Sequence, residues 1–331
     1  MFLVQKPNLS SHFRSTTNKP PHIPKTYQLF HQNLIFHLKT LDLTKTTSTI
    51  SLSWLSTALS FLSTLHTEAE AQMIHISKAQ ISNLKTDVDD YQSLYMDYSL
   101  KVLDLCNLIS TAVNQLTERR LLMNFALRLL NFTDQFPVHE KLNKAKDALT
   151  RSVNDTQGSG SATAKERGLR AKLLIEELTD LIGKLPRGGR DIVRRTFYAL
   201  GAMTVFVGSV LVGVLFGEMD VVKPQTIPAE FVWSDSFTGV QSQILDLINS
   251  KRNAVLEIDD VSSKAIVICD LLQGVVSGSG DDAAVRVCLV AGVKELVTSV
   301  KKYSDGVDEL TNGANGLFRS VLKTRNGRLD V

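Results

Sequence analysis

The sequence predicts an all-α protein, a bundle of long antiparallel helices with coiled-coil character and one very apolar central helix. Three observations support this prediction. Apolar residues recur at spacings of three and four along almost the whole chain, which is the period of an amphipathic helix. No two alternating segments are joined by the short turn of a β-hairpin. Thr196–Gly217 contains no charged residue.

Residues 1–27 are expected to form a flexible basic tail. The first 41 residues contain no Asp or Glu but several Lys and Arg, a composition that organellar transit peptides share. We favour the tail, because apolar periodicity begins at about Tyr27 and runs directly into the predicted folded part.

The N-terminal helical region is predicted to span residues 28–151. One helix begins near Ile50. Its apolar stripe consists of Leu52, Leu55, Leu59 and Leu62. Two more helices are expected, from Asp90 to about Asn131 and from Pro137 to about Arg151.

A polar Gly/Ser stretch at residues 152–164 has the composition of a flexible linker. Residues 165–195 are predicted to form a basic helix. After the uncharged stretch, residues 218–331 are expected to form a C-terminal helical hairpin. Its helices are predicted at about Glu230–Val276 and Ala283–Leu322, separated by a turn rich in Gly and Ser.

The uncharged stretch, residues 196–217, has two interpretations. As a helix it would be about 33 Å long, enough to cross a hydrocarbon core of about 30 Å. Alternatively, a fully buried central helix of a soluble bundle would also be apolar on all sides. The sequence slightly favours a membrane span, because the glycines of this stretch would weaken a soluble helix unless it were closely packed.

Basic residues precede this stretch and acidic residues follow it, so a spanning helix would leave its N-terminal side in the cytosol. The basic residues expected at the membrane flank are Arg187, Arg190, Arg194 and Arg195. One half of the helix carries small side chains, which would let another helix approach closely in a bilayer. These predicted helix-contact residues are Gly201, Gly208, Ser209, Gly213 and Gly217.

The charge of the chain limits its partners. A net charge of +3 is too small to indicate nucleic acid. Residues 1–195 carry a net charge of +7 and residues 218–331 one of −4. A basic half fits contact with an anionic membrane surface, although solvated helix faces would give the same asymmetry. The three cysteines form no CxxC pair, which indicates reduced core thiols in an intracellular protein.

The sequence lacks the common motifs of catalysis and metal binding. It contains no HExxH pattern and no GxSxG nucleophile turn. Its Gly/Ser segments follow no predicted strand and lack the lysine of a phosphate-binding loop. We therefore expect no metal, no cofactor and no conventional enzyme activity.

Five segments, in order along the chain, carry a family resemblance. They are ISLSWLSTAL (50–59), DYSLKVLDLCNLIS (97–110), RTFYALGAMTVFVGSVLVGVLFG (195–217), IPAEFVWSDSFTGVQSQI (227–244) and KYSDGVDELTNGANGLFRSVL (302–322). They resemble the plant BYPASS family. The resemblance implies a helical plant protein of development, whose relatives restrain a mobile root-derived signal that arrests shoot growth. It also implies a link to the exocyst and polarised secretion.

Three functional hypotheses follow. The first is a non-enzymatic developmental regulator that restrains production of this signal, is anchored in an intracellular membrane by residues 196–217, and binds a protein partner. The second is a soluble helical scaffold linked to the exocyst and polarised secretion. The third is an unrecognised enzyme of signal metabolism. A plastid or a soluble cytoplasmic location is the alternative to the membrane. Partner identity and oligomeric state are left open.

Overall fold

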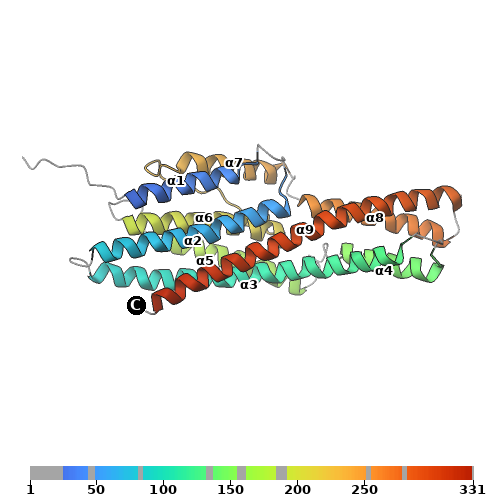
Figure 1. The fold of residues 1–331 in the computed structure, drawn as a ribbon, viewed down its shortest axis with the longest axis horizontal. Helices are drawn as coiled ribbons and strands as arrows, with labels where there is room; N and C mark the ends of the chain where they lie inside the picture. The colour runs from blue at the N-terminus through green and yellow to red at the C-terminus, as the bar shows by residue number, and fades with distance from the viewer. Residues whose placement is uncertain are drawn as a thin grey trace, which may run out of the picture.

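The computed structural model describes residues 25–43, 49–80, 85–131, 137–154, 162–183, 192–250, 255–277 and 282–329. Within these ranges the chain is helical and contains no β-strand, which confirms the predicted all-α class (Figure 1). The elements are α1 (Lys25–Thr40), α2 (Leu52–Gln80), α3 (Lys85–Leu129), α4 (His139–Asn154), α5 (Ala162–Gly183), α6 (Ile192–Phe216), the short 3-10 helix η3 (Met219–Val221), α7 (Ser234–Asn249), α8 (Leu256–Ser277) and α9 (Asp282–Leu329).

Two long helices connect the two halves of an elongated molecule. α3 has 45 residues and α9 has 48, so each is about 70 Å long. In one half they form a four-helix bundle with α4 and α8. In the other half they pack with α2, α5 and α6, and α1 and α7 form an outer layer (Figure 1). One continuous apolar core runs through both halves.

Helices α2 and α9 lie side by side and run in the same direction, although about 250 residues separate their contacting positions. The side of α9 that faces α2 carries a small residue at every seventh position. These residues are Gly306, Gly313, Ser320 and Gly327. A seven-residue repeat keeps one side of a helix against its partner over a long distance. α2 and α9 thus form a parallel pair. In the same bundle, the neighbouring helices α3 and α9 run antiparallel.

Serine side chains close the contact between α2 and α9 by bonding to the backbone of the opposite helix. Ser56 Oγ donates to the carbonyl oxygen of Glu309 at 2.8 Å. Ser320 Oγ donates to the carbonyl oxygen of Ser63 at 2.9 Å. Such short side chains reach a neighbouring backbone only where the two helices approach closely. The C-terminal helix is thus held firmly along the N-terminal region.

Residues 230–276, predicted as one helix, form two. α7 ends at Asn249 and α8 begins at Leu256, whose N–H donates to the carbonyl oxygen of Ile50 at 2.9 Å. Residues 251–254 lie outside the described residues. α7 packs against α1, whereas α8 packs against α4 and α9. Periodicity within one segment does not reveal this break, because the partners on either side of it come from distant parts of the chain.

Several predicted segments lie partly outside the described residues. These parts are residues 1–24 of the tail, 155–161 of the linker and 184–191 of the basic helix. The rest of the tail begins α1, and the rest of the linker belongs to the ends of α4 and α5. In the predicted C-terminal hairpin, α8 and α9 do pack together, but α9 continues past α8 along α2 and α3.

Candidate functional site

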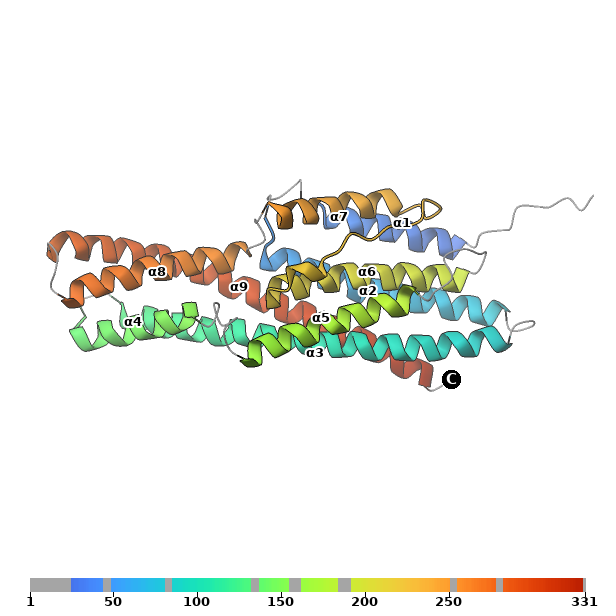
Figure 2. The same cartoon turned by 180° about the vertical axis from the view of Figure 1, so that it is seen from behind.

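Helix α6, which contains the uncharged stretch, lies inside its half of the molecule. Every residue from Thr196 to Gly213 is buried, and α2, α3 and α5 pack around it (Figure 2). On another side, the rings of Phe206 and Phe237 of α7 meet edge to face, with centroids 5.1 Å apart. By length and composition, α6 is the one helix among the described residues that could cross a membrane. In this structure the protein's own helices cover its apolar surface.

The predicted helix-contact face of α6 lies against helices of the same chain. A Cβ added to Gly201 would lie 2.1 Å from Ile182 Cδ1 of α5. A Cβ added to Gly208 would lie 3.0 Å from Ile175 Cδ1 of α5 and 3.0 Å from Leu105 Cδ2 of α3. These two glycines allow α6 to approach α5 and α3 more closely than a larger residue would.

The C-terminal part of this face serves other purposes. A Cβ added to Gly213 would lie 3.0 Å from Val222 Cγ2, in the segment that follows α6. Ser209 Oγ donates to the carbonyl oxygen of Phe206 in its own helix at 2.7 Å. Gly217 has a φ of +76°, a left-handed conformation that suits glycine and commonly terminates helices. Some of these small residues therefore allow close packing, and Gly217 ends the helix.

The predicted basic flank is only partly described. Arg187 and Arg190 lie outside the described residues, and Arg194 and Arg195 are half-buried in the first turn of α6. Arg195 connects this turn to α1 and to the segment that precedes α7.

Arg195 Nε donates to Tyr27 Oη of α1 at 2.8 Å. Its Nη2 donates to the carbonyl oxygen of Glu230 at 3.2 Å, and its Nη1 lies 3.5 Å from the carboxylate of the same residue. The guanidinium also lies 4.6 Å from the ring centroid of Phe231, a favourable cation–π distance. Arg195 would have to leave these contacts to reach a lipid headgroup.

A chain of buried hydrogen bonds crosses the core beside α6. Thr204 Oγ1 donates to the carbonyl oxygen of Leu200 in its own helix at 2.9 Å. It lies 2.7 Å from Tyr98 Oη of α3, which in turn lies 3.2 Å from His66 Nε2 of α2. Because the Thr204 proton is committed to Leu200, we assign Tyr98 as the donor to Thr204 and His66 Nε2 as the donor to Tyr98. The chain links α6 to α3 and α2.

This chain of hydrogen bonds was not predicted from the sequence. The signal was present, because His66 continues the stripe of Leu52, Leu55, Leu59 and Leu62 at the next helical spacing. A polar residue at a core position of a helix predicts a buried hydrogen bond. Burial lowers the pKa of His66 to about 3, so its ring is neutral at physiological pH.

We expect replacement of Thr204 with valine to destabilise the fold by about 1–2 kcal/mol, because the Tyr98 hydroxyl loses its acceptor. In a bilayer, the same change would favour insertion, since valine is more apolar than threonine. Urea unfolding without detergent measures the difference. Thr196→Val is the matched control, because buried Thr196 bonds to Ile192 of its own helix. Equal losses in both variants would contradict a special role for the chain.

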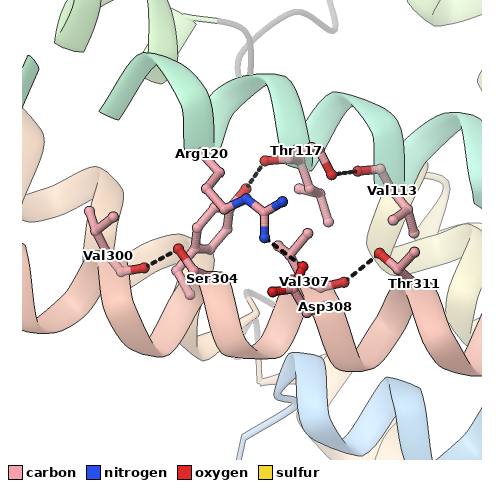
Figure 3. Close-up of polar contacts among 10 residues, drawn as sticks. Val113, Thr117, Arg120, Val300, Ser304, Val307, Asp308 and Thr311 are labelled. Carbon is pink, nitrogen blue, oxygen red and sulfur yellow. Dashed lines mark hydrogen bonds and ion pairs between the residues drawn. The ribbon is translucent and has the colours of Figure 1, made fainter. Parts of the chain in front are cut away.

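A second polar cluster lies where α3 and α9 cross, between the two halves of the molecule. Figure 3 shows Arg120 of α3 reaching across to Asp308 of α9, with Nη1 2.6 Å from Oδ1. Tyr303 Oη donates to the carbonyl oxygen of Leu116 at 2.9 Å. Three nearby hydroxyls bond within their own helices, those of Thr117, Ser304 and Thr311.

A buried arginine adds to this crossing. The side chain of Arg119 is almost fully buried, and its Nη2 donates to Ser262 Oγ of α8 at 2.6 Å. Its guanidinium lies 5.8 Å from the ring centroid of Tyr303. Arg119 thus joins α3, α8 and α9.

The cysteines of the described residues occupy both buried and exposed positions. No group of three or more His, Cys, Asp or Glu in this part of the chain could hold a metal ion. Burial raises the pKa of Cys106 to about 12, which keeps it a weakly nucleophilic thiol. The prediction of core thiols holds for Cys106 but is wrong for Cys288, which is exposed on α9. The apolar residues around Cys288 lie partly on the outer face of that helix.

The chain is similar in sequence to several plant proteins. A family model described as Protein ROH1-like matches residues 31–172, from α1 into α5. UPF0496 protein 4 of Oryza sativa subsp. japonica is 26% identical over 249 residues, and that of subsp. indica is 27% identical over 257 residues. Each alignment covers 71% of this chain and 52% of the rice protein, so the chain spans about half the length of these relatives.

A third relative aligns over most of both chains. Protein BPS1, chloroplastic, of Arabidopsis thaliana is 22% identical over 312 residues, which cover 91% of this chain and 82% of that protein. No solved structure matches the chain.

Proposed function

Because this chain is a BYPASS-related plant protein, as its resembling segments predicted, we propose that it is a non-enzymatic regulator of plant development. Its role is to restrain production of a root-derived mobile signal that arrests shoot growth, through contacts with a protein partner. The alignment with Protein BPS1 over 91% of this chain supports this proposal most strongly, because it must include helices of both halves.

The buried polar groups bond to one another, which supports a binding role rather than catalysis. Thr204, Tyr98 and His66 bond to one another, and Arg119 bonds to Ser262 between helices. Each group stabilises the arrangement of helices, and such an arrangement presents long outer faces to a partner. A helical scaffold of this kind acts by holding its surface in a fixed shape.

The proposed resting form is a folded bundle with α6 as its core helix. The burial of Thr196–Gly213 on all sides supports this form over a permanent single span. A membrane-anchored form is the alternative that the sequence favoured. A plastid location is a further alternative, because the name of the Arabidopsis relative describes that protein as chloroplastic.

Grafting tests the developmental role. Plants that lack this protein are expected to arrest shoot growth, and a wild-type shoot grafted onto their roots is expected to arrest as well. Return of growth when the intact chain is expressed only in the root is the control. Normal growth of wild-type shoots on such roots would contradict the proposed role, and loss of polarised secretion instead would favour the secretion scaffold.

Alkaline carbonate extraction tests the resting form. Membranes from plant cells that express the full chain, tagged at either end, are expected to release it into the supernatant, because a helix buried in its own bundle is not embedded in lipid. A known single-span protein in the same preparation should remain in the pellet. Retention of this chain with that control would show that α6 is inserted.

A further inference from the structure

Helix α1 carries an exposed apolar stripe on its outer side. Leu29 is 57% exposed and Phe36 is 66% exposed. Lys25, Gln32 and Lys39 are also exposed, and at 100° per residue all five positions lie within about 80° around the helix axis. A lysine therefore stands at each end of a stripe whose middle carries two large apolar side chains.

The opposite side of α1 is firmly packed, so this exposure does not come from a loosely placed helix. The buried side consists of Tyr27, Phe30, His31, Leu34 and Leu38. Polar contacts fix the helix as well, because Asn33 Nδ2 donates to Glu68 Oε1 of α2 at 3.0 Å and Arg195 donates to the Tyr27 hydroxyl. The fold thus presents the stripe as a rigid outward face in the outer layer of the molecule (Figure 1).

Helix α1 itself carries positive charge and no negative charge. α1 contains no carboxylate, and neither does any other residue among the first 41 of the chain. Three carboxylates of adjoining segments contact other side chains, those of Asp42 with Gln243, Glu68 with Asn33 and the exposed Glu230 with Arg195. The neighbouring α7 adds two exposed carboxylates, Asp235 and Asp246.

We propose that this face of α1 docks the protein reversibly on an anionic lipid surface. Leucine and phenylalanine on one face of a surface helix insert at the boundary of headgroups and acyl chains, and flanking lysines attract anionic headgroups. The absence of carboxylates from α1 provides the charge complementarity. This contact leaves α6 in the core, and it does not depend on the proposed developmental role.

Flotation of the full chain with vesicles tests the proposal. Wild-type protein is expected to float with vesicles of phosphatidylcholine and phosphatidylserine, and much less with phosphatidylcholine alone. The double variant Leu29→Ser, Phe36→Ser should lose at least about tenfold in vesicle partition, because both apolar anchors are removed. Lys25→Glu with Lys39→Glu should also weaken binding, and added salt should weaken wild-type binding.

The matched control is Leu121→Ser with Phe125→Ser, because these residues form another exposed Leu/Phe pair, on α3, at 63% and 49%. This variant should float like wild type, and all variants should retain wild-type helical circular dichroism. Absence of wild-type flotation, or equal loss in both apolar variants, would overturn the proposal. So would binding that survives the α1 changes and carbonate, which would point to insertion of α6. Loss of plant function in the α1 variant without any vesicle binding would point to a protein partner instead.

Discussion

Replacement of Gly306 with leucine is expected to lower the free energy of unfolding by about 3 kcal/mol. Even the first added atom has no room, because a Cβ at this position would lie 2.8 Å from Leu52 Cβ and 3.0 Å from Leu52 Cδ1. The Cβ of Leu52 is fixed to its backbone, so relief requires α2 and α9 to separate. Separation would also weaken the bond from Ser56 to Glu309.

Alanine variants provide the matched comparison within α9. Gly306→Ala should destabilise by about 1 kcal/mol, because overpacking exceeds the gain in helix propensity. Gly316→Ala should stabilise by up to about 1 kcal/mol, because the nearest atom to its added Cβ is Ser63 Oγ at 4.0 Å. Chemical unfolding followed by circular dichroism measures both. If the two alanine variants changed stability in the same direction, the close contact between α2 and α9 would be wrong.

Local pattern was sufficient to predict much of the fold. The all-α class followed from helical periodicity, and most of α6 was located because residues 196–217 carry no charge. The predicted ends of most helices lie within a few residues of those observed. These features depend on neighbours along the chain, and a single sequence contains that information.

The contact between α2 and α9 could not be predicted in the same way. Its repeat consists of Gly306, Gly313, Ser320 and Gly327, residues that a search for apolar periodicity passes over. Their partner helix lies about 250 residues earlier in the chain, and its Leu52 and Ser56 carry no mark of that pairing. Small residues show where another helix can approach, but they do not show which helix it is.

The sequence also could not decide whether α6 lies in a membrane or in a protein core, for a related physical reason. A bilayer and a protein core both accept an uncharged helix, so composition alone does not separate them. The contacts that α6 makes in the structure come from distant parts of the chain, such as Tyr98 on Thr204 and Ile182 against Gly201. Of the glycines that suggested a helix partner in the membrane, Gly201 and Gly208 face helices of the same chain in this structure.

Replacement of Val207 with arginine is expected to destabilise the folded bundle by more than about 4 kcal/mol, enough to prevent folding in many proteins of this size. Val207 has no exposed surface in the middle of α6, so the added guanidinium would lose its water without a partner prepared for it. Val214→Arg is the matched control, because Val214 is half-buried near the end of the same helix. Its arginine can reach solvent, so the cost should be about 1 kcal/mol.

Solubility and cooperative thermal unfolding in detergent-free buffer measure both variants. If α6 lies in the bundle, arginine at position 207 should cost much more stability than arginine at position 214, since only Val207 is enclosed by α2, α3 and α5. An α6 that resided in a bilayer would leave the remaining helices to fold without it, so Val207→Arg would impair membrane retention and spare the unfolding transition of the rest. If the Val207→Arg protein were soluble and unfolded like wild type, α6 could not be part of the core. A membrane span would then explain why residues 196–217 carry no charge.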